Sequence, residues 1–441
     1  MKRVRSLIPI GTATLLPHTA QSVRRLEDQL LAYLVKWGYQ EIILPSFEYL
    51  DVLSVGLPSE VLEKCYKFAD WTSGRILVLR PDATAQIARM VAMGLGGEAL
   101  PLRFSYRTTV FRYEPEHRGR DREMFQVGLE LIGIDSPQAD AEMVTILAGL
   151  LEQTGLPEWK ISLGHVGFLK ALLARSGLSP TARKQAEIAA AHKDLPRLEE
   201  ILTTEGLPRS MVRNILQVPE RCGQQDVLEW GKRIAGKDSQ LLKPLIRLEH
   251  VYKRLEITGV QDKVLLDLGE FRGFDYYDGV VFDVFTSTQG SEIGGGGRYN
   301  HLVGQFGRDF PAIGFGLDLD RLFSALERRG QVGGNGFEPV LLLASSHQTR
   351  ESFALAQVLR GVGVCVIEET VEKTPKPPLI WATEVARRRG LPRAVLIERK
   401  KGSSQSVLLL EFTTTSQKPR QTRLSILDLP QRLRGDIYGD F

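Results

Sequence analysis

An arginine-rich segment is the most polar part of the chain, with four arginines between Arg112 and Arg122. A planar guanidinium group donates two parallel hydrogen bonds, which suits phosphate and carboxylate ligands. Gln126 and Glu130 follow it in a run that alternates polar and apolar residues, so both side chains face one side of the expected strand. A lined polar pocket is one interpretation of this pattern. The other is a solvated hairpin tip whose opposite charges pair with each other.

A second polar cluster precedes an apolar strand and holds Glu270, Arg272, Tyr276 and Tyr277 among turn residues. Such groups could bind a small zwitterion, because arginine binds a carboxylate, glutamate an ammonium group and a tyrosine hydroxyl a ring nitrogen. A core tyrosine pair beside a helix cap is the alternative. The glycine run at 294–297 would let a backbone approach a ligand closely, but it matches no phosphate-binding loop motif.

Hydrophobic periodicity and turn residues predict the elements that position these side chains. In chain order they are a helix at 21–37, a strand at 41–45, a hairpin at 64–79, a helix from about 82, a strand pair at 101–112 and 125–132, a helix at 139–154, strands at 264–268 and 279–286, and a strand-to-helix junction at 312–326.

The organisation of the chain reads as two domains joined by a glycine-rich linker at 327–336. The first domain is expected at 1–326, and its stretch at about 180–243 reads as a helical insertion because short helical patterns replace the strands. The second, at 337–441, is expected to be a small α/β domain. Its predicted elements alternate as strands at 339–344 and 362–368, helices at 349–359 and 379–389, and final strands at 394–398 and 406–412.

The composition is that of an ordinary globular protein, with 441 residues, 57 Lys and Arg against 53 Asp and Glu, and 43% apolar residues. A formal charge of +4 gives no global signal for nucleic acid. Cys65, Cys222 and Cys365 lie far apart in no metal-binding pattern, so we expect no disulfide framework, metal or other cofactor, and a reducing cytoplasm as location. No apolar run approaches the roughly 18 residues that cross a bilayer, so no membrane association is expected.

Three segments resemble motifs 1, 2 and 3 of class II aminoacyl-tRNA synthetases: the helix and strand ending at Pro45, residues 111–114 with the arginine segment, and residues 314–321. Residues 272–277 and 296–299 resemble the two histidine-recognition motifs of histidyl-tRNA synthetases. The resemblance covers about residues 8–326. It implies an α+β fold, with a class II aminoacyl-tRNA synthetase-like antiparallel sheet and flanking helices.

Within that superfamily the chain is more similar to the regulatory subunit of short-form ATP phosphoribosyltransferase than to the synthetase. The segments that carry this similarity lie at 79–89, 130–133, 162–167 and 306–312. The family implies a non-catalytic partner of the catalytic subunit, required for the first step of histidine biosynthesis and for its feedback regulation by histidine. It also implies a homodimer, formed through the motif 1 region, within a hetero-oligomer. The alternative is a histidyl-tRNA synthetase, which would use ATP to aminoacylate tRNA.

The resemblance also implies which residues would contact bound histidine. Glu130 and Thr84 would hold the α-ammonium group of histidine, Gln126 and Arg272 would lie near its carboxylate, and Tyr276 and Tyr277 would face its imidazole. The complete expected histidine site is Asp82, Thr84, Arg112, Gln126, Glu130, Arg272, Tyr276 and Tyr277, with Asp318 and Arg321 contributed by motif 3 and no catalytic residue.

Asp318 is the main departure from the synthetase pattern, because it replaces the third glycine of motif 3 and would bring a carboxylate towards the ATP site. A like charge at 4 Å costs about 1 kcal/mol in water and about 4 kcal/mol at an effective dielectric constant of 20. The corresponding loss of ATP affinity is about tenfold to a thousandfold. Arg112, Arg272 and Arg321 match synthetase positions that act on ATP and histidine, so the enzyme stays the alternative.

The second domain resembles the anticodon-binding domain of the synthetase only loosely and reads as a degenerate version of it. Residues 372–378 stand where that domain has a glycine-containing basic loop. The basic clusters at 387–389 and 399–401 are interpreted as solvated helix and turn ends, so tRNA is not an expected partner. A third interpretation is a binding module that docks the partner protein.

Overall fold

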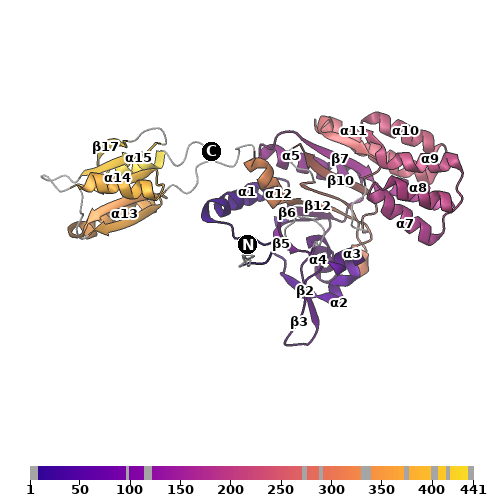
Figure 1. The fold of residues 1–441 in the computed structure, drawn as a ribbon, viewed down its shortest axis with the longest axis horizontal. Helices are drawn as coiled ribbons and strands as arrows, with labels where there is room; N and C mark the ends of the chain where they lie inside the picture. Colours follow the sequence, from indigo (N-terminus) through magenta and orange to yellow (C-terminus); the bar gives the residue numbers. More distant parts are fainter. Residues whose placement is uncertain are drawn as a thin grey trace, which may run out of the picture. The chain divides into compact units, whose positions relative to one another are not determined.

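The computed structural model describes residues 8–95, 99–113, 122–270, 276–287, 292–328, 339–371, 377–398, 406–413 and 418–435. The chain divides into two compact units, Met1–Val332 and Gly333–Phe441, which are described separately (Figure 1). None of the helices in the described ranges is long and apolar enough to cross a membrane.

A nine-stranded sheet forms the centre of the first unit. Its strands are β1 (Gln40–Glu41), β5 (Leu102–Phe111), β6 (Glu123–Ile132), β7 (Trp159–His165), β8 (Cys222–Gly223), β9 (Val264–Asp267), β10 (Val280–Thr286), β11 (Gly294–Arg298) and β12 (Ala312–Asp318). Their spatial order is β1-β5-β6-β12-β11-β10-β7-β9-β8. The neighbours are antiparallel except for the β1–β5 and β7–β9 pairs. The predicted strand pair at 101–112 and 125–132 is confirmed as β5 and β6.

Successive side chains of the sheet strands point to opposite faces and pack into two separate hydrophobic cores. On β6, Val127, Leu129 and Leu131 point into the larger core, whereas Ile132 joins the smaller one on the other face. Helices α1 (Pro17–Lys36), α5 (Pro137–Gln153) and α12 (Leu319–Glu327) pack on the larger core, and α4 (Ala83–Met90) on the smaller. Helix α1 buries Leu26, Leu30 and Leu34 at the spacing of one helix face, as its sequence predicts.

The predicted strand at 41–45 is wrong beyond its first residue, because β1 ends at Glu41. The carbonyl groups of Leu44 and Pro45 do not join a sheet ladder. They accept hydrogen bonds from Nη1 of Arg80, at 3.0 and 2.8 Å. The chain then enters a three-stranded sheet of order β2-β4-β3, formed by β2 (Phe47–Tyr49), β3 (Lys67–Ala69) and β4 (Ile76–Leu79) with the short helices α2 (Leu50–Leu53) and α3 (Ser59–Glu63).

Six α-helices lie between β7 and β9 in the sequence. They are α6 (Val166–Arg175), α7 (Pro180–Ala191), α8 (Leu195–Thr204), α9 (Arg209–Gln217), α10 (Gln225–Ala235) and α11 (Ser239–Ile257), and they gather at one end of the unit (Figure 1). The helical region therefore runs past the expected end near 243. A buried carboxylate, Asp140 of α5, joins α11 to the sheet, because it accepts hydrogen bonds from Arg247 at 2.6 Å and from Arg298 at 2.7 Å.

The second unit is a five-stranded sheet with helices. Its strands have the order β14-β13-β15-β16-β17. The elements are β13 (Val340–Ser345), α13 (Thr349–Gly361), β14 (Val366–Val371), α14 (Pro378–Arg388), β15 (Arg393–Ile397), β16 (Ser406–Glu411), β17 (Arg420–Ser425) and α15 (Leu429–Gly435). The sequence predicts the first six of these elements and misses β17 and α15. All residues of β17 except Leu424 are polar, so its apolar signal is weak.

Candidate functional site

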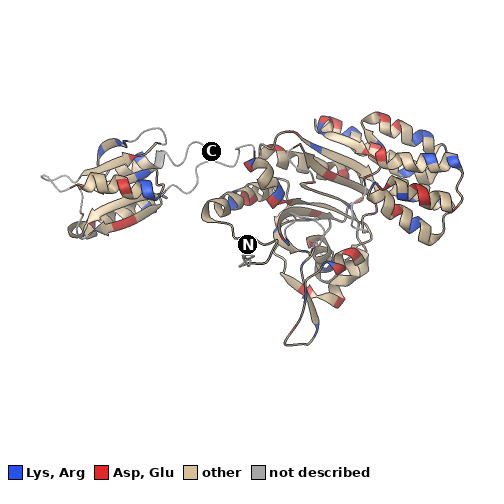
Figure 2. Ribbon diagram, viewed as in Figure 1, with Lys and Arg blue, Asp and Glu red and all other residues tan. Residues whose placement is uncertain are grey.

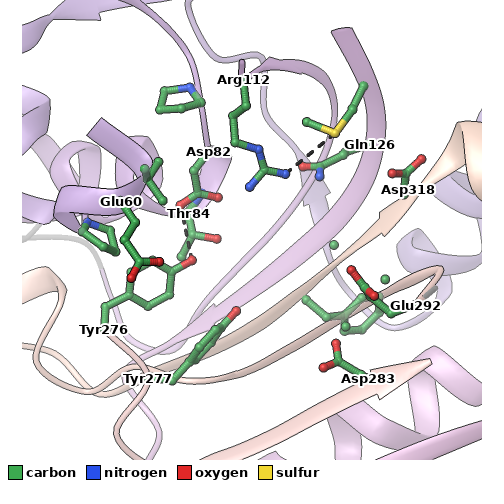
Figure 3. A pocket seen from close by; sticks show the side chains of 18 of the residues that line it. Glu60, Asp82, Thr84, Arg112, Gln126, Tyr276, Tyr277, Asp283, Glu292 and Asp318 are labelled. Carbon is green, nitrogen blue, oxygen red and sulfur yellow. Dashed lines mark hydrogen bonds between the residues drawn. The ribbon is translucent and has the colours of Figure 1, made fainter. Parts of the chain in front are cut away.

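A cavity of about 670 Å³ lies over the sheet of the first unit (Figure 3). It is lined by the start of α4, by strands β6, β11 and β12, by the start of α12, and by α7 of the helical region. The described lining residues include seven carboxyl groups, four Lys and Arg side chains, and His192. The acids are Glu60, Asp82, Glu187, Glu270, Asp283, Glu292 and Asp318, and the bases are Lys64, Arg112, Lys184 and Arg321.

Asp82 stands at one end of the cavity as the N-cap of α4. Its carboxylate accepts hydrogen bonds from the backbone N–H groups of Thr84, at 3.4 Å, and Ala85, at 3.3 Å. The hydroxyl group of Tyr276 donates a third, at 3.3 Å. Burial raises the pKa of Asp82, and the charge of Arg112 opposes that rise. A short acidic side chain can therefore both cap a helix and face a ligand.

Glu130 lies directly behind this end of the cavity and is only 1% exposed. Its carboxylate accepts hydrogen bonds from Oγ1 of Thr84 at 2.7 Å and from the hydroxyl group of Tyr299 at 2.5 Å. Burial raises its pKa to about 8, although both donors favour the charged form. Thr84 lines the cavity and Glu130 does not, so the structure connects Glu130 to the cavity through Thr84.

Three tyrosines form an aromatic wall beside these carboxylates. The ring centroid of Tyr276 lies 4.8 Å from that of Tyr277 and 6.0 Å from that of Tyr299. Tyr276 and Tyr277 line the cavity, whereas Tyr299 is buried beneath them. The sequence did not single out Tyr299 as a site residue, although it lies in the segment at 296–299 that resembles a histidine-recognition motif.

Arg112 and Gln126 occupy a third side of the cavity (Figure 3). Arg112 points its guanidinium group inward, with Nη2 at 3.9 Å from the sulfur of Met124. Arg272, the remaining expected histidine ligand, lies outside the described residues. The structure thus brings together all the other predicted site residues around one cavity, and the roles given to each of them stay predictions.

Asp318 and Arg321 stand together at the opposite end, where β12 meets α12. One oxygen of Asp318 accepts the backbone N–H of Arg321 at 3.1 Å and caps α12, and the other lies 3.3 Å from Nε of the same arginine. Nη1 of Arg321 also donates to Glu292, to its backbone oxygen at 2.5 Å and its side chain at 3.2 Å. Burial raises the pKa of Asp318, and Arg321 opposes the rise.

The glycine run at 294–297 forms strand β11 and not a loop. A Cβ atom on Gly296 would lie 2.0 Å from the backbone oxygen of Gly314, so the close approach is to the neighbouring strand. A Cβ atom on Gly314 would lie 1.6 Å from Oε2 of Glu130. Gly314 therefore leaves room for the buried Glu130, and Gly294 and Gly295 line the cavity.

Comparison with known proteins shows the family to which this chain belongs. The family model described as histidyl-tRNA synthetase matches residues 11–322. An ATP phosphoribosyltransferase regulatory subunit from Geobacter metallireducens is 34% identical over 394 residues, which are 89% of this chain and 90% of that protein.

Two solved structures have the same fold. One, described as an ATP phosphoribosyltransferase regulatory subunit/histidyl-tRNA synthetase from Bacillus halodurans, is 28% identical with a TM-score of 0.76, covering 86% of this chain and 96% of the other. A histidyl-tRNA synthetase from Nostoc sp. PCC 7120 has a TM-score of 0.78 over 97% and 99% of the two chains, and at 22% identity it shows the fold alone. The chain belongs to the family of ATP phosphoribosyltransferase regulatory subunits, which share the fold of histidyl-tRNA synthetases.

Proposed function

We propose that this chain is the non-catalytic regulatory subunit of a short-form ATP phosphoribosyltransferase, and that histidine binds in its cavity as a feedback effector. The complex would carry out the first step of histidine biosynthesis. One observation supports the effector site: within the described residues, which leave out 271–275, the carboxyl groups of Asp82 and Glu130 accept hydrogen bonds from hydroxyl and amide groups and from no basic side chain. Asp82 lines the cavity and can therefore accept a hydrogen bond from the α-ammonium group of an amino acid, and Glu130 can act on the same group through Thr84.

The charge of the cavity favours an amino acid over a nucleotide. Among the described lining residues, seven carboxyl groups outnumber four Lys and Arg side chains, and this balance disfavours a triphosphate. Arg321, which matches a phosphate-binding position of the synthetases, is engaged by Asp318 and Glu292. These contacts support a site that binds histidine without activating it.

An exposed apolar surface that follows the motif 1 region in the chain supports association with a second copy of the chain. It surrounds the β2-β4-β3 sheet, where Trp71 at the hairpin tip is fully exposed and the ring centroids of Phe47 and Phe68 lie 6.0 Å apart. Its exposed apolar members are Ile43, Phe47, Phe68, Trp71 and Ile76. Exposed patches of this kind mark protein interfaces. The homodimer would sit within a hetero-oligomer that contains the catalytic subunit.

The described basic residues of the second unit give little support for tRNA binding, and the cluster at 399–401 lies outside the described residues. Arg389 pairs with Glu369, Arg423 with Glu398 at 2.6 Å, and Arg432 with Glu411 at 3.8 Å. Figure 2 shows acidic and basic residues interspersed on this unit. A cytoplasmic location is supported by Cys65, Cys222 and Cys365, which are all free.

Reconstitution with a short catalytic subunit tests this function. The affinity of histidine for this chain would be measured alone, in the complex, and in the complex with ATP and phosphoribosyl pyrophosphate. Feedback regulation requires a coupling free energy of about 1–3 kcal/mol, so these affinities should differ by about fivefold to 150-fold. One common affinity under all three conditions would contradict the proposal, because binding couplings are reciprocal.

A further inference from the structure

The start of α12 has the parts of an anion-binding site. This nine-residue helix begins at the cavity wall, and the free N–H groups of a first helical turn carry partial positive charge. Arg321 lies in the same turn, and Arg112 stands on the adjacent wall. A phosphate group would be the natural ligand for such an arrangement.

The protein's own carboxylate already occupies this position. Asp318 is 9% exposed, and its two oxygens take up the capping N–H of Arg321 and its Nε atom, at 3.1 and 3.3 Å. Glu292 takes Nη1 of the same arginine through both its backbone and side-chain oxygens. A phosphate at this place would have to displace Asp318 or lie against its charge.

We propose that Asp318 is a built-in anion that excludes nucleotide phosphates from this end of the cavity. The inference deepens the proposed effector function and rests on it, since a regulatory site that rejects ATP can report histidine independently of a substrate of the catalytic subunit. Asp318 is thus a specificity-determining residue. Its removal should strengthen ATP binding by about tenfold to a thousandfold, which is about 1.4–4 kcal/mol.

Two variants of the full chain test this role. Asp318→Asn keeps the size and the capping ability of the side chain and removes its charge, and Asp318→Ser also removes volume while still capping the helix. ATP binding would be measured by equilibrium dialysis, with and without Mg²⁺. We expect both variants to bind ATP at least tenfold more tightly than the unmodified chain. Glu292→Gln should give a smaller gain, because it weakens one of several contacts to Arg321.

The matched control is Asp320→Asn, two residues further along α12. Asp320 accepts the backbone N–H of Phe125 at 3.0 Å and does not line the cavity, so its neutralisation should leave ATP binding unchanged. The inference is overturned if the unmodified chain binds ATP as tightly as Asp318→Asn, with or without Mg²⁺, or if Asp320→Asn gives the same gain. Histidine binding by the unmodified chain is measured in parallel, and its absence would contradict the proposed function without touching the result for ATP.

Discussion

The two ends of the cavity are both acidic, yet their carboxylates have different partners. At the α4 end, Asp82 and Glu130 accept hydrogen bonds from hydroxyl and amide groups. At the α12 end, Asp318 and Glu292 are bound to the guanidinium group of Arg321. Within the described residues, the carboxyl groups of the first end accept no hydrogen bond from a basic side chain, whereas those of the second end are paired with an arginine of the protein itself.

This difference suggests how one fold can keep a site for an amino acid while losing the site for the nucleotide with which that amino acid would react. An amino-acid site needs a free carboxylate for the ammonium group, whereas a nucleotide site needs free basic groups for phosphates. In the proposed function, the α4 end meets the first requirement. At the α12 end, Asp318 and Glu292 both pair with Arg321, and in the proposal these two contacts keep that arginine from a phosphate.

The largest effect should come from the buried carboxyl group of Glu130. Its pKa is about 8 in the folded protein and about 4.5 in an unfolded chain, so the folded state binds its proton more tightly. Its stabilising contribution is therefore complete below about pH 4.5 and is lost as the pH rises to about 8. Over this pH range, we expect the free energy of unfolding of the unmodified chain to fall by up to about 5 kcal/mol more than that of the Glu130→Gln variant.

Urea denaturation at a series of pH values measures this difference. The control is Glu63→Gln, which changes an exposed glutamate at the end of α3 and should leave the pH dependence as it is. A Glu130→Gln profile parallel to that of the unmodified chain would contradict the assignment, since it would mean that Glu130 titrates as an ordinary carboxyl group.

Neutralising the α4 end should weaken histidine binding by a moderate amount. Asp82→Asn keeps an N-cap on α4 and removes the charge that would face the ammonium group. A hydrogen bond to a charged group contributes about 1.5–3 kcal/mol, so histidine affinity should fall by about tenfold to a hundredfold. Calorimetric titration measures it, with Asp320→Asn as control. Unchanged affinity in Asp82→Asn would remove this end of the cavity from the site.

The smallest expected effect belongs to Tyr276. Its hydroxyl group donates to Asp82 at 3.3 Å, and Tyr276→Phe keeps the ring that packs on Tyr277. Loss of one such hydrogen bond is worth about 0.5–1.5 kcal/mol, which is about a twofold to tenfold change in histidine affinity. A loss as large as that in Asp82→Asn would show that the hydroxyl group contacts the ligand itself.

The sequence predicts most of the fold and the location of the site, because both depend on local patterns. Strand alternation identifies β5 and β6 and places Gln126 and Glu130 on one face of β6. The motif at 314–321 identifies the junction of β12 and α12. The additional elements β17 and α15 were missed, because their apolar residues are few and their burial depends on neighbours in the second unit.

The contacts that decide function are long-range and could not be read from spacing. Tyr299 meets Glu130 across 169 positions of the chain. Helix α7 contributes Glu187 and Lys184 to the cavity only because the helical region folds back over the sheet. Asp318 was expected to approach the ATP site, but its double contact with Arg321 depends on the turn of the chain at the start of α12.

Histidine-dependent exchange of pyrophosphate into ATP by the full chain, with histidine binding measured in the same preparation, tests the central claim most directly. The account predicts that histidine binds and that no exchange occurs, because the α4 end is open to an amino acid and the α12 end is closed to phosphates. Exchange at the rate of a synthetase would contradict it. That result would mean that Arg112 and Arg321 still act on ATP despite Asp318.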